Sequence, residues 1–342
     1  MDGEGKAMRL GVLALQGAFE EHKKMVEALK FPSLEVVQVR TKEELGVCDA
    51  LIIPGGESTT MRIIAQADEL FLSLRQFALE EKKPVWGTCA GSILLSEHIT
   101  STSSGGKCLG SAEIAKLLLE AEEERERAAA LSLCGKKEKT TDAYGEFVGG
   151  VDVITSRNFF GRQIASFECP IHPCGELAES EAAKSFKAVC IRAPAILATL
   201  SDEVEVLARL PLVPSQPAPP IQTSQLTEPH SPSSVTTTSA ADEKAQGAGT
   251  GTPATPPRSL PPSPAPSQKA PETAPTLCAP PVEDVQSAKR GVGLASFREQ
   301  EVIAAVAQGN ILMTIFHPEL TDDPFFHRYF VERFLGLKAE KA

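Results

Sequence analysis

The sequence predicts an α/β domain built on a mostly parallel sheet with helices on both faces. In the first hundred residues, short apolar runs alternate with stretches of helical spacing, which is the pattern of strand–helix–strand units. The apolar runs end at glycine-containing turns, as strands do before a helix. Further short strands occur near the carboxyl terminus, so both ends of the chain are expected to contribute to one sheet.

The N-terminal elements alternate between strands and helices. Each expected strand is a short apolar run, and each expected helix carries apolar residues at intervals of three or four. The strands are placed at 8–15, 34–39, 50–53 and 85–88, and the helices at 18–30, 57–81 and 90–98.

The later part of the chain is expected to form short strands joined by loops, followed by a closing helix. Turn residues such as Gln308-Gly309 separate these strands. The strands are placed at 151–155, 163–167, 188–191, 204–207, 302–306 and 310–316, and the helix at 324–335.

Two segments break this pattern and are interpreted as inserts in one domain that spans residues 8–337. The first, 100–141, begins with a Ser/Gly run and contains a Glu- and Arg-rich helix at 112–130. A solvated helix is favoured there over a docking element. The second, 211–290, holds 18 of the 26 prolines and no Phe, Tyr or Trp. It cannot bury enough apolar surface to offset its ordering entropy, so we expect it to be disordered.

Composition and charge exclude several classes of function. The net charge of −11 argues against a nucleic-acid partner, because phosphate binding needs clustered Lys and Arg. The eight cysteines include no Cys-x-x-Cys pair, so neither a zinc site nor a disulfide framework is expected. No apolar run reaches membrane-spanning length, and the first residues lack the hydrophobic region of a secretion signal. The sequence predicts a soluble, cytoplasmic protein without a metal site.

The segment Gly87-Thr88-Cys89-Ala90-Gly91 has the form Gly-x-nucleophile-x-Gly and follows a predicted strand. A nucleophile elbow of this kind holds its reactive side chain on a strained turn between a strand and a helix. The N-terminus of the helix behind the cysteine favours the thiolate. The pentapeptide alone fits a buried structural cysteine equally well, and its place after a strand favours the nucleophile.

His317 and Glu319 can supply a base and the group that orients it. A thiol nucleophile needs a base to remove its proton and an acid to protonate the departing amine, and one histidine can do both. Glu319 follows His317 across a proline, so its carboxylate can hold the imidazole in one tautomer. The other five histidines are expected on helix surfaces (His22, His98 and His327) or in irregular segments (His172 and His230).

Residues 54–59 (PGGEST) follow the third predicted strand. A glycine pair at the end of a strand can expose backbone N–H groups that stabilise an oxyanion. The structural alternative is an ordinary turn in which Ser58 or Thr59 caps the next helix, and both readings can hold together. The segment is not a phosphate loop, because no Gly-Lys-Ser/Thr follows.

Taken in order, the segments ALIIPGGESTT, VWGTCAG and FHPELT resemble the class I (triad) glutamine amidotransferases. More narrowly, they resemble the glutaminase subunit of pyridoxal 5′-phosphate synthase. Three further segments are specific to this narrower family: VLALQG at 12–17, RNFFGRQ at 157–163 and IRAP at 191–194. The resemblance covers nearly all of the chain outside the two inserts.

The resemblance implies a flavodoxin-like, three-layer open sheet with a triad of Cys89, His317 and Glu319 at the carboxyl ends of its strands. It implies hydrolysis of L-glutamine to L-glutamate and ammonia through a thioester on Cys89, without a cofactor. Backbone N–H groups near Gly56 and Ala90 would hold the oxyanion. The glutamine contacts of the family correspond to Gly56, Glu57, Ser58, Arg157, Ile191 and Arg192.

The resemblance also implies a partner. In the family the glutaminase works weakly alone and is activated by docking to a (β/α)8-barrel synthase, which uses the ammonia to build pyridoxal 5′-phosphate (vitamin B6). Gln16 corresponds to a residue beside the site, at the face that meets the synthase. Compact family members lack the two inserts and a shorter expansion near 169–186, all of which fall in expected loops.

Two other functions stay open on the sequence. The chain could be the glutaminase of a different amidotransferase, although RNFFGRQ and IRAP argue against this. It could instead be a weakly active interaction subunit whose inserts recruit other proteins. The intact Cys89, His317 and Glu319 argue against a loss of catalysis.

Overall fold

The structure is a computed structural model that describes residues 7–67, 69–100, 109–133, 147–157, 159–161, 166–212, 298 and 300–338. The Ser/Gly run after Thr100 and nearly all of the proline-rich segment 211–290 lie outside these residues. So does most of the strand expected at 163–167.

The N-terminal part alternates strands and helices as the sequence predicts. Its strands are β1 (Met8–Leu13), β2 (Leu34–Val39), β3 (Ala50–Ile53), β4 (Val85–Thr88) and β5 (Ser96–Thr100). Its helices are α1 (Phe19–Ala28), α2 (Lys42–Gly46), α3 (Ser58–Ala67), α4 (Leu70–Arg75), the π-helical turn η1 (Gln76–Glu80), α5 (Ala90–Leu95) and α6 (Ser111–Leu133).

The C-terminal part consists mainly of strands. They are β6 (Val151–Ser156), β7 (Phe167–Pro170), β8 (His172–Pro173), β9 (Lys187–Cys190), β10 (Ala195–Thr199), β11 (Glu205–Pro211), β12 (Glu301–Gln308) and β13 (Ile311–Thr314). The helical segments are η3 (Gly175–Leu177), α7 (Glu181–Ser185), the 3-10 turn η5 (Pro318–Leu320) and α9 (Phe325–Phe334).

Among the described residues, eleven strands form one sheet in the order β2-β1-β3-β4-β13-β12-β10-β6-β5, with β11 beside β12 and β8 beside β11. The half that runs from β2 to β13 is parallel, and the strands around β12 are antiparallel. β7 and β9 form a separate pair. Both ends of the chain therefore contribute to one sheet, and the predicted α/β class is confirmed.

The register of the parallel half gathers three loops at one edge. Thr314 at the end of β13 pairs with Thr88 at the end of β4, and Ile53 at the end of β3 pairs with Gly87. Because parallel strands end at the same edge of the sheet, the segments that begin at Pro54, Cys89 and Ile315 start side by side. These segments carry the three motifs that the sequence singled out.

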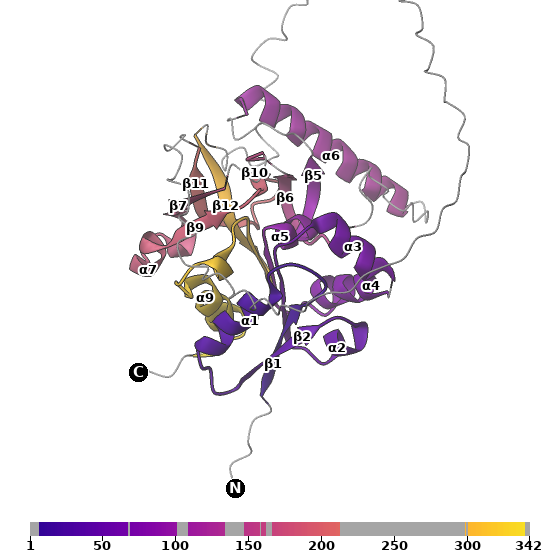
Figure 1. The fold of residues 1–342 in the computed structure, drawn as a ribbon. Helices are drawn as coiled ribbons and strands as arrows, with labels where there is room; N and C mark the ends of the chain where they lie inside the picture. Colours follow the sequence, from indigo (N-terminus) through magenta and orange to yellow (C-terminus); the bar gives the residue numbers. More distant parts are fainter. Residues whose placement is uncertain are drawn as a thin grey trace, which may run out of the picture. The chain divides into compact units, whose positions relative to one another are not determined.

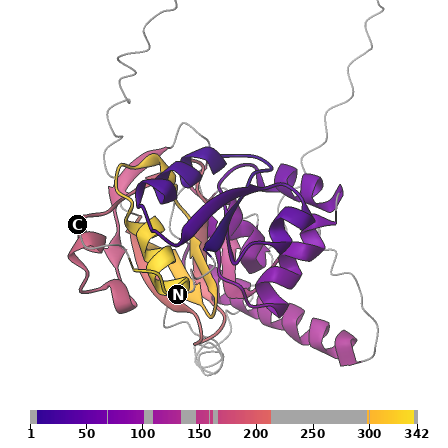
Figure 2. The same cartoon turned by 90° about the horizontal axis from the view of Figure 1, so that it is seen from below.

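Helices cover both faces of the parallel half (Figure 1). The N-terminal α1 and the C-terminal α9 pack against each other on one face, and α2, α3 and α4 lie on the other (Figure 2). The strands between them are buried on both sides: Ile52 and Trp86 point to one face and Leu51 and Val85 to the other, and all four are at most 1% exposed. Continuous apolar strands of this kind are typical of parallel sheets covered on both faces.

Two predicted helices are shorter than the pattern suggested. The helix expected at 57–81 is divided into α3, α4 and η1, with Glu69 in a left-handed conformation (φ 54°) between α3 and α4. The helix expected at 90–98 ends at Leu95. The residues from Ser96 onward form β5, because they pair with the parallel neighbour β6, a tertiary interaction that overrides local helical spacing.

The favoured interpretation of the first insert as a solvated helix is wrong. Ile114, Leu118 and Ala121 of α6 share one face of the helix and are at most 3% exposed. They pack in the core beside β6 and β10. Glu124 on the same helix lies 3.0 Å from Nδ1 of His98 on β5. The Glu- and Arg-rich composition concealed this apolar stripe.

We predict that truncating the buried face of α6 destabilises the domain. Ile114→Ala should lower the free energy of unfolding by about 2 to 5 kcal/mol, because the cavity left by a buried Ile adds to the lost burial. Leu119→Ala, on the half-exposed face of the same helix (49% exposed), should change it by less than about 0.5 kcal/mol. Urea denaturation of both variants measures the difference, and equal effects would show that α6 is solvated.

Candidate active site

Cys89 lies at the junction of β4 and α5 and is 6% exposed. Its backbone has a φ of 46° and a ψ of −104°, an unusual conformation for a residue with a side chain. Its N–H group donates a 2.8 Å hydrogen bond to the carbonyl of Thr314, which ties the turn to β13. Strained backbone of this kind concentrates at functional sites, and it agrees with the predicted nucleophile elbow.

The two glycines of the elbow are required by close packing. A Cβ atom on Gly91 would lie 2.1 Å from the carbonyl oxygen of Ile53 on β3, and one on Gly87 would lie 2.7 Å from the carbonyl oxygen of Gly91. The spacing Gly-x-Cys-x-Gly therefore lets α5 begin directly against β3 and β4. Backbone N–H groups in the first turn of such a helix have no acceptor within the helix, so those next to Cys89 can face a bound anion.

The partly buried His317 and the buried Glu319 form a hydrogen-bonded pair after β13. Nδ1 of His317 lies 2.7 Å from Oε1 of Glu319, and Glu319 is 5% exposed. The backbone N–H group of His317 donates a 2.8 Å hydrogen bond to the carbonyl of Val189 on β9. Pro318 begins η5 and fixes the turn between the two side chains. The carboxylate is thus positioned to hold the imidazole in one orientation.

The charges of the pair favour an imidazolium beside Cys89. Burial alone lowers the pKa of His317, but hydrogen bonds to Cys89 and Glu319 outweigh it and raise the pKa to about 10. Burial raises the pKa of Glu319, but the nearby rings of His22 and His317 hold it well below its ordinary range. The carboxylate therefore stays ionised and the ring of His317 holds its proton at neutral pH.

The loop 54–59 lies against both Cys89 and His317. A Cβ atom on Gly55 would lie 2.5 Å from Cε1 of His317 and 3.2 Å from Cβ of Cys89. Oε1 of Gln16 accepts a 2.8 Å hydrogen bond from the backbone N–H group of Glu57. The structure thus brings Gln16, Gly55 and Gly56 together with Cys89 and His317.

Glu57 itself caps α3, in place of the Ser58 or Thr59 that the structural alternative offered as the cap. Its two carboxylate oxygens accept hydrogen bonds from the backbone N–H groups of Thr59 (3.0 Å) and Thr60 (2.7 Å). Partial burial acts to raise the pKa of Glu57, but a hydrogen bond from the hydroxyl of Thr60 and the two backbone bonds lower it to about 2. A negative charge at a helix N-terminus is also favoured by the helix dipole.

The remaining predicted site residues are Arg157, Ile191 and Arg192, which follow the strands β6 and β9. Arg157 follows β6, and its Nη2 donates hydrogen bonds to Oγ of Ser58 (2.8 Å) and Oγ1 of Thr59 (3.0 Å). Ile191 and Arg192 follow β9, beyond the carbonyl that holds His317. Arg192 is exposed and left-handed (φ 49°), and its side chain bonds to none of the other predicted site residues in the described part of the chain. Asn158 and residues 162–165 lie outside that part.

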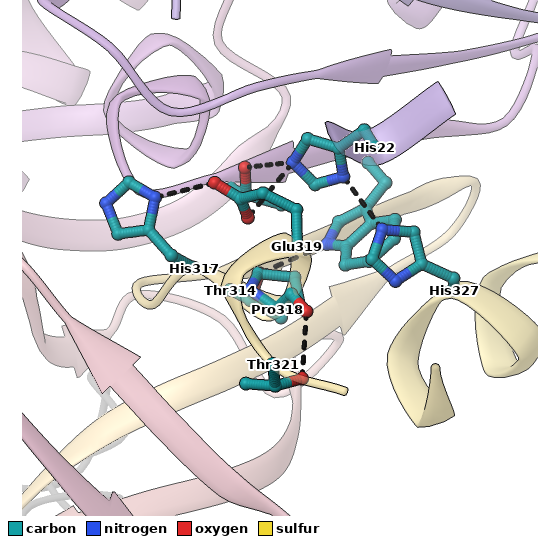
Figure 3. Close-up of polar contacts among 9 residues, drawn as sticks. His22, Thr314, His317, Pro318, Glu319, Thr321 and His327 are labelled. Carbon is teal, nitrogen blue, oxygen red and sulfur yellow. Dashed lines mark hydrogen bonds and ion pairs between the residues drawn. The ribbon is translucent and has the colours of Figure 1, made fainter. Parts of the chain in front are cut away.

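The expectation that His22 and His327 are surface residues is wrong. Both are fully buried, and Figure 3 shows them in line behind Glu319. A sequence signal for His22 existed: it precedes the buried Val26 by four residues on α1, and positions four apart share a face of a helix. His98 is a strand residue on β5 and only 14% exposed. His172 belongs to β8, and His230 lies outside the described residues.

Other kinds of site are not found in the described residues. No cluster of His, Cys, Asp and Glu side chains among them could hold a metal ion. The five cysteines described there, including Cys89 and Cys190, are free thiols. The helices described lack the length and apolar character needed to cross a membrane.

We predict that Gly55→Ala slows the reaction of Cys89 with iodoacetamide by up to about 100-fold. The added methyl group would overlap the ring of His317, and a displacement of about 1 Å at a reacting group costs rate on this scale. Gly46→Ala is the matched control, since nothing lies within 4 Å of a Cβ atom there. Peptide mapping by mass spectrometry gives the rate at Cys89. Equal rates in the two variants would place His317 away from the thiol.

Comparison with known proteins identifies the family and the fold. The model of the SNO glutamine amidotransferase family matches residues 12–114 and 270–336. A crystal structure of a glutamine amidotransferase superposes with a TM-score of 0.50 at 25% identity and covers 96% of this chain and 99% of that chain. This likeness confirms the predicted fold.

Two curated relatives are named as subunits of one enzyme. A probable pyridoxal 5′-phosphate synthase subunit PDX2 from Arabidopsis thaliana is 31% identical over 325 residues, covering 95% of this chain and 85% of the relative. A pyridoxal 5′-phosphate synthase subunit PDX2 from Plasmodium falciparum is 39% identical over 201 residues, covering 58% of this chain and 75% of the relative. The chain belongs to the SNO glutamine amidotransferase family.

Proposed function

We propose that this chain is the glutaminase subunit of a pyridoxal 5′-phosphate synthase and that it hydrolyses L-glutamine to L-glutamate and ammonia. The observation that carries the proposal is the 2.7 Å bond between His317 and Glu319 beside Cys89 on its strained turn, where Gly55 lies against both the imidazole and Cys89. The names of the relatives from Arabidopsis and Plasmodium support the choice of this synthase. Of the two alternatives from the sequence, neither is favoured by a specific contact.

In the first half of the reaction, the sulfur of Cys89 attacks the side-chain amide carbon of glutamine. The C–N bond breaks, and His317 gives its proton to the departing nitrogen, which leaves as ammonia. The product is a thioester between Cys89 and the glutamyl group. Glu319 keeps the ring in the tautomer that this proton transfer requires.

In the second half, a water molecule hydrolyses the thioester. His317, now neutral, takes a proton from the water as its oxygen attacks the thioester carbon. The C–S bond breaks and glutamate leaves, so the thiolate–imidazolium pair is restored. In both halves the backbone N–H groups of Gly56 and Ala90 hold the negative oxygen.

The substrate is held by groups on either side of the glycine loop. Gly56, Glu57 and Ser58 are proposed to contact glutamine, with the carboxylate of Glu57 facing the substrate ammonium. Among the described residues, Oε1 of Glu57 accepts a 3.0 Å hydrogen bond from the N–H group of Thr59, and its second lone pair can face the ammonium. Arg157 and Arg192 suit the α-carboxylate, and Ile191 completes the contacts.

The ammonia is proposed to pass to a (β/α)8-barrel synthase subunit that docks near Gln16. The hydrogen bond from Gln16 to the glycine loop gives such docking a direct path to the oxyanion site. We propose that the protein works in the cytoplasm, where free thiols such as Cys89 persist. No cofactor takes part in this half of the synthase reaction.

We predict that Cys89→Ala lowers the release of glutamate from glutamine by a factor of about 10⁴ or more, because the nucleophile is lost. Cys48→Ala, at a buried thiol just before β3 and so at the opposite edge of the parallel sheet from Cys89, is the matched control and should keep the wild-type rate. Each protein is assayed with and without the barrel synthase, and the synthase should raise the rate of the wild type and of the control.

Two results would contradict the proposal. Folded wild-type protein that releases no glutamate with a competent synthase would remove the enzymatic function and favour an interaction subunit. Glutamate release that the barrel synthase leaves unchanged would favour a glutaminase of another amidotransferase.

A further inference from the structure

A row of buried polar side chains continues from the triad into the core of the domain. Figure 3 shows Glu319 between His317 and His22, with His327 beyond His22. Nε2 of His22 lies 3.3 Å from Oε2 of Glu319 and 3.2 Å from Oγ1 of Thr88. Nδ1 of His22 lies 2.9 Å from Nε2 of His327. The two histidines come from α1 and α9, and both are fully buried.

The hydrogen-bond directions along this row follow from the charge of Glu319. An ionised carboxylate only accepts, so the nitrogen of His22 that faces it carries the proton. In the tautomer of His22 that carries its proton at Nε2, Nδ1 accepts and Nε2 of His327 donates. Nδ1 of His327 is left without a proton, and it has no hydrogen-bond partner among the described residues. Desolvation lowers the pKa of His327 well below its ordinary value, and the neighbouring His22 adds to this effect.

The two oxygens of Glu319 therefore face two different imidazoles. Oε1 bonds to His317, and Oε2 has His22 as its polar neighbour in the described part of the chain. Oε2 forms no hydrogen bond among the described residues, so its 3.3 Å contact with Nε2 of His22 is electrostatic. Attractive contacts on both oxygens restrain the position and the rotation of the carboxylate. With His22 absent, Oε2 would be a buried charge without a partner, which is costly unless the side chain turns or takes up a proton.

Aromatic packing holds the two histidine rings in place. The ring of Trp86 meets His22 edge-on at a centroid distance of 5.7 Å and His327 at 4.9 Å. Its Nε1 donates a 3.1 Å hydrogen bond to Oγ1 of Thr314, at the end of β13. The row is thereby fixed to the same two strands, β4 and β13, that carry Cys89 and His317.

We propose that His22, supported by His327, is a positioning residue of the catalytic site: it holds Glu319 ionised and turned so that Oε1 fixes the tautomer of His317. The proposal rests on the glutaminase function proposed above. A purely structural role for the two histidines is the alternative, since most buried polar groups are hydrogen-bonded whatever their function. The two roles differ in whether the effect of His22 passes through Glu319.

The test is a set of variants of the full chain assayed with the barrel synthase. His22→Leu removes the donor, and His22→Gln keeps an amide N–H group that can reach the position of Nε2. Each change is made in the wild type and in Glu319→Gln. Phe330→Leu is the matched control, because Phe330 is equally buried and also touches Trp86 but makes no polar contact with the row.

We predict that His22→Leu lowers kcat by about 10- to 100-fold, the size of effect known for groups that orient the ligands of a metal. KM should stay within about twofold of the wild-type value. His22→Gln should recover most of this loss. In the Glu319→Gln background, His22→Leu should have little further effect, because residues that act through one another are not additive. His327→Leu should lower kcat in the same direction and add little to His22→Leu.

Three results would overturn the proposal: a folded His22→Leu protein with unchanged kcat, a full additive loss in the Glu319→Gln background, or a loss equal to that of Phe330→Leu. If His22→Leu does not fold, His22→Gln is compared with His22→Asn, whose shorter amide reaches only the position of Nδ1. A kcat at least about tenfold higher for the Gln variant supports the proposal, and equal values overturn it.

A second readout separates this inference from the proposed function. The rate at which iodoacetamide alkylates Cys89 is measured for the same variants without glutamine. His22→Leu should slow alkylation and His22→Gln should restore it, even if wild-type protein released no glutamate. An unchanged alkylation rate in folded His22→Leu would count against the positioning role.

Discussion

The hydrogen bond between His317 and Glu319 is the interaction on which the rest of the site depends. A carboxylate that is 5% exposed is tolerated only when its charge is met by donors, because desolvation of an unpaired ion costs several kcal/mol. His317 and His22 meet the two oxygens from different elements. The N-terminal helix α1 and the C-terminal turn η5 must therefore both be in place before the imidazole of His317 can be oriented.

The sheet supplies the geometry that this pair requires. Thr88 and Thr314 are register partners at the ends of β4 and β13, so the nucleophile and its base begin from adjacent strands. The left-handed backbone of Cys89 costs about 1 to 3 kcal/mol, and the buried parallel strands on either side hold it there. The glycine loop after β3 approaches the same point, because Ile53 pairs with Gly87. The strained backbone of Cys89 and the buried charge of Glu319 thus both lie near the edge where these three strands end.

Sequence patterns predicted the features that are local and missed those that depend on distant pairing. The elbow at Cys89 and the His317–Glu319 pair occupy short segments with distinct residue types, so their placement after strands followed from the chain itself. His22 and His327 are 305 positions apart, and their mutual hydrogen bond, with the contacts of His22 to Thr88 and Glu319, makes both suitable for burial. The buried apolar face of α6 and the strand β5 were missed because each depends on contacts with β6. The cap at Glu57 was missed because glutamate is a less common capping residue. The roles of Arg157, Ile191 and Arg192 toward glutamine stay predictions.

The most direct test of this account is the titration of His317 by NMR in protein with labelled histidines, assigned with His317→Gln. Burial lowers its pKa, but the bonds to Cys89 and Glu319 should hold it near 10, so the ring should stay protonated through neutral pH. The stability that this interaction contributes is fully present below the ordinary histidine pKa of about 6.5 and is lost as the pH rises through the folded value. In Cys89→Ala the pKa of His317 should fall, because one of the two groups that raise it is gone. A wild-type His317 that loses its proton near pH 6.5, unchanged in Cys89→Ala, would contradict the coupling of thiol, imidazole and carboxylate.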